Sequence, residues 1–322
     1  MKTLFILLAL MTSLNVYSAQ KQLSPREDVM THEEIKQTVS NTINALEHTY
    51  LYPERATQLR ALLSAKLNNN GFRPNQTVDD FRRVLRSIII KATKDTSIDI
   101  VREYPITLTS ITSSKKENTY QHNDSIEAEI LEHNIGYLKL AGNINFNGVY
   151  QAIEKAFESL SGADAMIIDL RLADETHMQI AQLIVSYFVP NNTIIGQVEY
   201  SGSTSPLVSL MQEQSAKQAL PLYILNSSFV AGEWEFISYT LKHFNKAMIV
   251  GEETMGVGHF TKQINLNKHL TLKLPYAVIK HPVTQQVWDE NGVVPDHFTK
   301  ADKAFDKAYE IALRMLNTID NK

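Results

Sequence analysis

Residues Leu225 to Lys242 read LNSSFVAGEWEFISYTLK, and they join the end of an apolar run to the start of an amphipathic segment. The run Leu222 to Leu225 predicts a buried strand, and Trp234 to Phe244 has the apolar spacing of a helix. The small and polar residues between them predict a strand-to-helix corner that includes Gly232.

Short apolar runs alternate with longer amphipathic segments from Asn134 onward. This alternation predicts an α/β fold, because strands and helices that follow each other along a chain pack in layers. The expected strands are Ile135–Leu140, Ala165–Leu170, Leu222–Leu225, Ala247–Val250 and Leu270–Leu274. The expected helices are Val149–Leu160, Met178–Phe188, Trp234–Phe244 and a closing helix that begins at Thr299.

The region from residue 30 to 105 predicts a helical N-terminal subdomain. Thr31 and Glu34 have the spacing of a capping box, in which each residue satisfies a free backbone donor of the other. Pro53 suits the first turn of a second helix, and Thr77 is positioned to start a third. The apolar faces of these helices must be buried against each other or against a neighbouring domain.

The first 19 residues predict a secretory signal peptide. Lys2 is followed by the apolar run Leu4 to Met11, which is too short to span a bilayer, and small residues follow before Ala19. We therefore expect an exported protein, either periplasmic or secreted, and the alternatives are an uncleaved anchor or a buried helix. No later run is long enough to cross a membrane, so we expect no stable membrane span.

Composition narrows the possible chemistry and partners. The 322 residues carry a formal net charge of -4 and no cysteine, which excludes a thiol nucleophile and a disulfide. No basic excess marks a nucleic-acid partner. The 10 histidines lack the paired spacing of a metal site, and no phosphate-binding loop is visible. We therefore expect no nucleic-acid partner, no metal and no cofactor.

Several segments, in the same order, resemble the tail-specific (C-terminal processing) serine protease family. The resemblance covers the corner quoted above and the segments IGYLKLAGNINFN from Ile135, AMIIDLR from Ala165, MIVGEETMGVGHF from Met248 and VWDENGVVPD from Val287. It implies a crotonase-like (ClpP/crotonase) core, which we place at residues 126–320. The helical region, beginning TINALEHTYLYPERA, is most similar to the branch that includes interphotoreceptor retinoid-binding protein.

Many processing proteases of this family carry a PDZ domain between the two regions. Only 28 residues lie between Pro105 and Asn134 here (134 − 105 − 1). An independent domain needs at least about 50 residues. We therefore expect no PDZ domain at this place.

The resemblance implies a catalytic serine at the corner, but no hydroxyl group stands at that position. In an alignment without gaps the serine position falls on Gly232. If Ala231–Gly232–Glu233 is aligned instead with the family's Ser-Ala-Gly-Glu, the serine position becomes Val230. Ser227 and Ser228 are nearby, but serines at a strand end more often cap the backbone than act as nucleophiles.

The general base of the family is also replaced. One branch has a lysine in a Gly-Lys-Gly turn, and Val257 stands there, 25 positions after Gly232 (257 − 232). The other branch has a histidine after the helical region, where this chain has Ser97. His259 is close to the Val257 turn and is a candidate for a substitute base, although a lone histidine beside a turn is more often structural.

The oxyanion site departs from the family pattern as well. The family has glycines after its Asp-Leu-Arg motif, which let backbone donors approach the substrate, but this chain has Glu175 and Thr176 nearby. A β-carbon crowds those donors, and the charge of Glu175 opposes a developing oxyanion. Loss of one oxyanion donor lowers kcat by about 100- to 1000-fold.

Three functional hypotheses follow from these substitutions. The leading one is a catalytically degenerate protein of this family that binds a peptide end or an apolar small ligand in the remnant cleft. The alternative is an active serine-type peptidase or other hydrolase with a relocated nucleophile, Ser227, Ser228 or Ser238, and His259 as the base. The third is a structural or regulatory partner of an exported, active relative.

Overall fold

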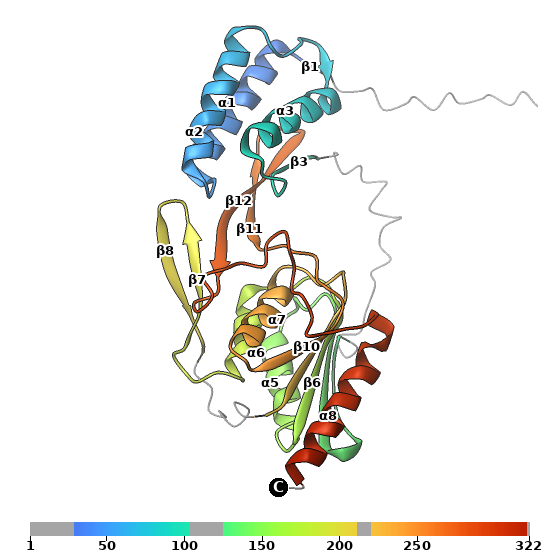
Figure 1. Cartoon of the computed structure of the whole chain (residues 1–322). Helices are drawn as coiled ribbons and strands as arrows, with labels where there is room; N and C mark the ends of the chain where they lie inside the picture. The colour runs from blue at the N-terminus through green and yellow to red at the C-terminus, as the bar shows by residue number, and fades with distance from the viewer. Residues whose placement is uncertain (1–28, 104–124, 211–219, 321–322) are drawn as a thin grey trace, which may run out of the picture.

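The computed structural model describes residues 29–103, 125–210 and 220–320 (Figure 1). The expected signal peptide, residues 1–19, lies outside these ranges. The described chain forms a helical N-terminal region, a six-stranded sheet covered by helices, and a second sheet that connects the two. The mixed α/β architecture expected from the alternation of runs is confirmed.

The N-terminal region consists of three helices: α1 (His32–Thr49), α2 (Pro53–Asn68) and α3 (Val78–Thr93). The capping box at the start of α1 is confirmed, since the Thr31 side chain accepts from the Glu34 N–H and the Glu34 carboxylate accepts from the Thr31 N–H. Pro53 occupies the first position of α2. The short strands β1 (Val29–Met30) and β2 (Gln76–Thr77) pair in antiparallel fashion beside the helices.

The main sheet has the strand order β13-β10-β9-β6-β5-β4, in which only β4 is antiparallel to its neighbour. Its strands are β4 (Ile126–Leu131), β5 (Ile135–Gly142), β6 (Ala165–Ala173), β9 (Leu222–Asn226), β10 (Ala247–Gly251) and β13 (His297–Phe298). Its helices are α5 (Val149–Ser159), α6 (Met178–Ser186), α7 (Glu233–His243) and α8 (Ala304–Asp320).

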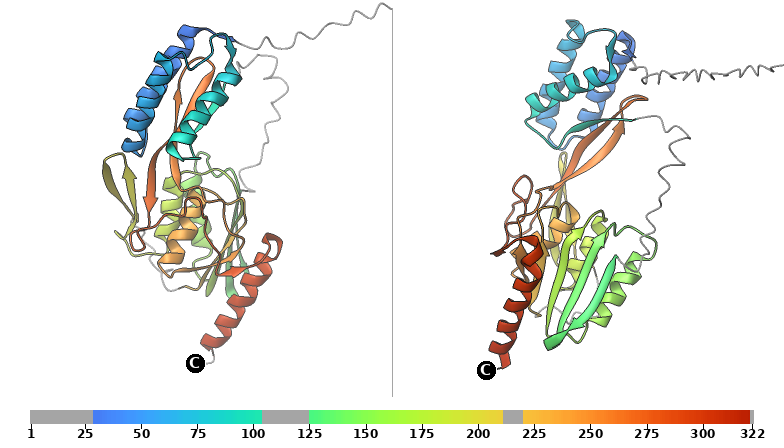
Figure 2. Two further views of the ribbon diagram at one scale, coloured as in Figure 1. Left: turned by 45° about the horizontal axis from the view of Figure 1, so that its top comes forward. Right: turned by 90° about the vertical axis from the view of Figure 1, so that its right-hand side faces the viewer.

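Helices cover both faces of this sheet (Figure 2). Leu138 and Leu140 of β5 point toward the core with α5, α6 and α7, whereas Ile135 and Tyr137 point toward α8 on the opposite face. Successive strand residues point to opposite faces, so both faces of β5 are apolar and buried.

The second sheet has the order β11-β12-β7-β8, and β3 (Asp99–Arg102) also pairs with β12. Its other strands are β7 (Ile194–Tyr200), β8 (Ser203–Val208), β11 (His259–Asn265) and β12 (Leu270–Lys280). The beginning of β12 pairs with β3, and its end pairs with β7. Leu270, Leu272 and Leu274 of β12 belong to the same buried cluster as the N-terminal helices.

The β11–β12 hairpin therefore extends from the main body to the helical region, as Figure 1 shows. The division into subdomains at 30–105 and 126–320 stays a prediction. The hairpin lies within the second range in sequence but shares a hydrophobic core with the first.

The predicted strands and helices of the main body are all present, and most bounds differ by at most three residues, although the strand expected at Leu270–Leu274 continues to Lys280 as β12. One prediction is wrong: the closing helix begins at Ala304, not at Thr299. Thr299 follows β13 and donates its N–H to the Gly251 carbonyl, 3.0 Å away, so its backbone still continues the sheet. A short 3₁₀ turn, Ala301–Lys303, comes before the helix.

Candidate functional site

The strand-to-helix corner lies between the end of β9 and the start of α7. Gly232 is the residue before the helix, with φ 60° and ψ −121°. Residues with a side chain rarely adopt this backbone conformation, whereas glycine does so without strain. A β-carbon added to Gly232 would meet no atom within 4 Å, so space for a side chain remains at this position.

Glu235 fixes this corner to the turn that follows β10. Its carboxylate is fully buried and receives four hydrogen bonds. Oε2 accepts from the backbone N–H groups of Gly232 (2.9 Å) and Val257 (2.8 Å). Oε1 accepts from the Gly256 N–H (2.6 Å) and from the Thr254 hydroxyl (2.5 Å). A buried carboxylate is tolerated when donors surround it in this way.

A cavity of about 380 Å³, which we call the corner cavity, opens beside Gly232. It is lined by Gly232, Glu233, residues 257–261, Tyr276 and Trp288. The structure thus brings Gly232, Val257 and His259 to one place. Neither of the first two carries a reactive group, so the titratable side chains on the wall are Glu233, His259 and Tyr276.

His259 is held by contacts at both ring nitrogens. Nδ1 lies 2.8 Å from Oδ2 of Asp289 as an ion pair, and Nε2 lies 3.0 Å from the Tyr52 hydroxyl. Burial alone would lower the pKa of His259, but the contact with Asp289 outweighs burial and raises the pKa overall. The imidazole could take a proton from a serine only after one of these contacts breaks.

Ser97 does not line the corner cavity. Its hydroxyl and its backbone N–H both donate to Oδ1 of Asp95, and the Tyr50 hydroxyl donates to Oδ2 at 2.7 Å. The Tyr50 and Tyr52 rings meet edge to face with centroids 5.5 Å apart. Asp95, which binds Ser97, is thus connected to His259 through Tyr50 and Tyr52.

The three serines proposed as relocated nucleophiles do not line the corner cavity either. Ser227 is buried and donates its hydroxyl to the Arg171 carbonyl at 2.9 Å. Ser238 is fully buried within α7 and donates to Oδ1 of Asn226 at 3.0 Å. Ser228 is exposed, next to Ser227 at the end of β9.

Glu175 and Thr176 connect the loops that follow β5 and β6. The exposed Glu175 carboxylate accepts from the Asn143 amide at 3.1 Å, and the Thr176 hydroxyl donates to the Ile144 carbonyl at 3.2 Å. This pair of loops lies beside the start of α7, because the Trp234 indole N–H donates to the Asp174 carbonyl at 2.8 Å. Neither Glu175 nor Thr176 lines the corner cavity.

Two features of the site were not predicted from the sequence. Tyr52 contacts His259 across 207 positions of sequence, and no local pattern could have indicated this pair. Glu233 lies on the cavity wall, directly after Gly232, and burial raises the pKa of its carboxyl group. The sequence did hold a signal for Glu233, because the family pattern has alanine after its serine.

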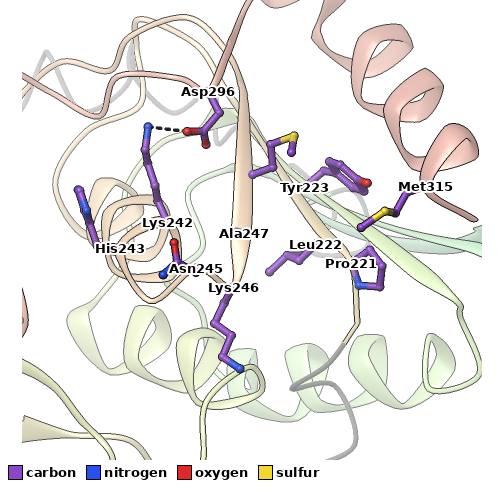
Figure 3. Close-up of a pocket in the computed structure, with 11 residues that line it drawn as sticks. Pro221, Leu222, Tyr223, Lys242, His243, Asn245, Lys246, Ala247, Asp296 and Met315 are labelled. Atoms are coloured by element: carbon purple, nitrogen blue, oxygen red, sulfur yellow. Dashed lines mark ion pairs between the residues drawn. The ribbon is translucent and has the colours of Figure 1, made fainter. Parts of the chain in front are cut away.

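A second cavity of about 470 Å³ lies at the other end of the strands of the main sheet, where β9 and β10 begin (Figure 3). It borders Leu222 and Ala247, where β9 and β10 begin, whereas Gly232 follows the end of β9. Lys242 and Asp296 form an ion pair of 3.0 Å at its rim. None of the residues predicted from the sequence to be functional lines this second cavity.

Within residues 29–103, 125–210 and 220–320, no group of three or more histidine, aspartate or glutamate side chains could hold a metal ion. In the same part of the chain, no helix combines the length and the apolar character needed to cross a bilayer.

Comparisons with known proteins agree with the resemblance seen in the sequence. The chain is 25% identical over 192 residues to a carboxyl-terminal-processing protease of Synechocystis sp., which covers 56% of this chain and 44% of that protein. It is 26% identical over 179 residues to the chloroplastic carboxyl-terminal-processing peptidase 2 of Arabidopsis thaliana, with coverages of 53% and 34%. The match therefore spans less than half the length of these relatives.

The fold is similar to that of the photosystem II D1 C-terminal processing protease, with a TM-score of 0.58 and 15% identity over 83% of this chain and 93% of that one. Residues 134–298, just over half of the chain, match peptidase family S41. The chain belongs to peptidase family S41.

Proposed function

We propose that this chain is a non-catalytic member of family S41 that binds a peptide end or an apolar small ligand in the corner cavity. One observation carries the proposal. Gly232 and Val257, the positions that match the family's serine and lysine, line one cavity and supply neither a hydroxyl nor an amine to it. Serine-dependent hydrolysis needs a nucleophile and a base within hydrogen-bond reach of each other.

The backbone at the corner supports the alignment without gaps. Gly232 has the positive φ expected of a strained strand-to-helix corner, and it lies on the cavity wall. Val230, the serine position of the other alignment, is fully buried in the main core. Both observations support the proposal that the scaffold around the family's reactive position is kept here without the reactive atoms.

The alternative is an active hydrolase with a relocated nucleophile. The His259–Asp289 contact favours it, because a histidine paired with a carboxylate is the usual base of a hydrolytic triad. The hydroxyl group at Nε2, however, belongs to Tyr52 and not to a serine. Burial and nearby carboxylates raise the pKa of Tyr52, which makes it a poor nucleophile at neutral pH.

A fluorophosphonate probe separates the two hypotheses. The purified full chain is incubated with the probe, beside an active processing protease as a positive control, and labelling is read by intact mass. We expect the control to be labelled and this chain to remain unlabelled. Labelling of one serine to a stoichiometry near one would overturn the non-catalytic assignment.

Binding in the cavity can be followed by tryptophan fluorescence, since Trp288, one of two tryptophans in the chain, is on the cavity wall. We expect a saturable change with short peptides or with the neutral apolar dye N-phenyl-1-naphthylamine. Val257→Trp should fill the cavity and abolish binding. Val294→Trp is the matched control, because Val257 and Val294 are 41% and 57% exposed and only Val257 lines the cavity.

Two finer assignments also belong to this proposal. We infer that the main body is of the crotonase-like class, which the parallel strand order and the resemblance of its motifs support. We also infer export through the N-terminal signal, which would place the protein with peptides and other proteins outside the cytoplasm. The third hypothesis, a regulatory partner of an active relative, predicts that such a protease purifies together with this chain.

A further inference from the structure

We propose that the corner cavity takes a cationic group, an ammonium or a guanidinium, and that Glu233 is its counter-ion. The proposal rests on the assignment of the cavity as a binding site, and it specifies which end or side chain of a peptide the site accepts. A lysine or arginine side chain, a free peptide N-terminus and a polyamine share this chemistry.

Glu233 is available for such a role because another residue caps the helix. It is the first residue of α7, and the Gly232 N–H before it is already bound by Glu235. Among the described residues, no ion pair or hydrogen bond from another side chain reaches the Glu233 carboxylate. Burial raises the pKa of the Glu233 carboxyl group, and the exposed His177 acts on it electrostatically in the opposite direction. A half-buried carboxylate without a cationic contact gains from a cation in the cavity.

Three aromatic residues also line the cavity: Phe260, Tyr276 and Trp288. Aromatic faces attract ammonium and guanidinium groups, more strongly when water is excluded. A carboxylate combined with aromatic walls suits a cation with an alkyl stem better than it suits a neutral apolar ligand or an anion.

The other charges near the cavity do not offset this preference. His259 is on the wall, but its charge is balanced by Asp289 at 2.8 Å. Asp95 and Glu290 also act on His259 electrostatically, and both are acidic. The acidic groups around the cavity therefore disfavour an anion.

The experiment compares small probes by calorimetry or tryptophan fluorescence on the full chain. The probes are Nα-acetyl-lysine methylamide, Nα-acetyl-arginine methylamide, alanyl-alaninamide and spermidine. Each is compared with its neutral counterpart, such as the Nε-acetylated lysine probe. We expect at least one cationic probe to bind at least about tenfold more tightly than its neutral form, and the preferred probe identifies the source of the cation.

Glu233→Gln should remove this preference, while Glu253→Gln should leave it unchanged, because Glu253 is exposed and does not line the cavity. Melting temperatures of both variants check that they fold. If Glu233→Gln does not fold, the comparison of charged with neutral probes on the unmodified chain decides the question alone.

Equal binding of charged and neutral probes would overturn the cation assignment and leave the non-catalytic binding function standing. No binding of any cationic probe would also overturn it. Fluorophosphonate labelling, in contrast, would overturn the non-catalytic function itself, so the two failures are distinguishable.

Discussion

Gly232 and Val257 donate their backbone N–H groups to the same atom, Oε2 of Glu235, at 2.9 and 2.8 Å. In the alignment without gaps proposed above, these two residues stand at the positions where the family has its nucleophile and its lysine base. The geometry that would bring a nucleophile and a base together is therefore maintained by a buried carboxylate, independently of either reactive side chain.

Replacing Glu235 should therefore destabilise the protein strongly. Glu235→Ala leaves four donors without their acceptor in a buried place, and we expect the free energy of unfolding to fall by about 3–5 kcal/mol. Glu235→Gln keeps one acceptor oxygen but turns an amide group toward two donors, so it should also destabilise. Urea denaturation measures both, with the exposed Glu253→Gln as control. A loss below 1 kcal/mol for Glu235→Ala would contradict the role given to this carboxylate.

The backbone at Gly232 can be tested with three alanine substitutions. Gly232 and Gly202 both have positive φ values, of 60° and 77°, with nothing within 4 Å of an added β-carbon. Gly256, at φ 79°, would place its β-carbon 2.9 Å from backbone atoms of Glu290 and Gly292. We expect Gly232→Ala and Gly202→Ala to cost about 1–2 kcal/mol through backbone strain alone.

Gly256→Ala should cost more than either, because a steric clash adds to the strain. Thermal or chemical unfolding of the three variants ranks their losses of stability. If Gly232→Ala destabilised the protein as much as Gly256→Ala, the conclusion that the corner has space for a side chain would be wrong.

Restoring the hydroxyl alone should not restore hydrolysis. Gly232→Ser fits the available space, but Val257 provides no base and the ring nitrogens of His259 are held by Tyr52 and Asp289. We expect the folded variant to remain unlabelled by a fluorophosphonate and inactive on peptides. Rapid labelling of Ser at this position would show that His259 can leave its contacts and act as a base.

The sequence predicted the strands whose buried side chains form a continuous apolar run. The apolar runs of β5, β6, β9 and β10 lie in the sheet interior, so the runs themselves indicated strands. Strand β11, HFTKQIN, is mostly exposed, and β8 includes Pro206 at a sheet edge, so neither forms an apolar run. Each of these strands instead forms a hairpin with its neighbour in sequence, β11 with β12 and β8 with β7, so it is held by backbone pairing and not by an apolar run of its own.

Motif matching to the family could predict part of the candidate site. Motif matching placed Gly232 and Val257 at related positions, and the structure places both on one cavity wall. Motif matching could not reveal that Tyr52, from the helical region, occupies Nε2 of His259. That contact depends on how the hairpin docks against the helices, which is a tertiary property.

The contacts of His259 should make stability depend on pH. The pKa of His259 is raised above its usual 6.5 in the folded state, despite burial, by Asp289. A raised pKa means that the folded state binds the proton more tightly, so the stabilisation is complete below pH 6.5 and is lost as pH rises through the folded-state pKa. Asp289→Asn should remove this loss, as measured by melting temperature from pH 6 to 9. An unchanged pH profile in that variant would contradict the ion pair.

We expect His281 to make the protein less stable in acid, the opposite of the effect expected for His259. Its side chain is buried, and its Nδ1 faces the backbone N–H groups of Val283 and Thr284 at 3.4 and 3.3 Å. A proton on Nδ1 would remove that acceptor. Burial, followed by the nearby His243, lowers the pKa of His281 from 6.5 to about 4.

Because the unfolded chain binds this proton more readily, stability should fall as pH decreases from 6.5 toward 4, by up to about 3 kcal/mol. His281→Asn keeps a side-chain acceptor for the turn but cannot take up a proton in this range. The variant should be less stable than the parent at pH 7 because it loses the ring contacts of His281 with Tyr239, His243 and Phe244. Its free energy of unfolding should nevertheless vary less between pH 6.5 and 4. Equal slopes in the two proteins, measured by urea denaturation across that range, would show that the acid sensitivity arises from another group.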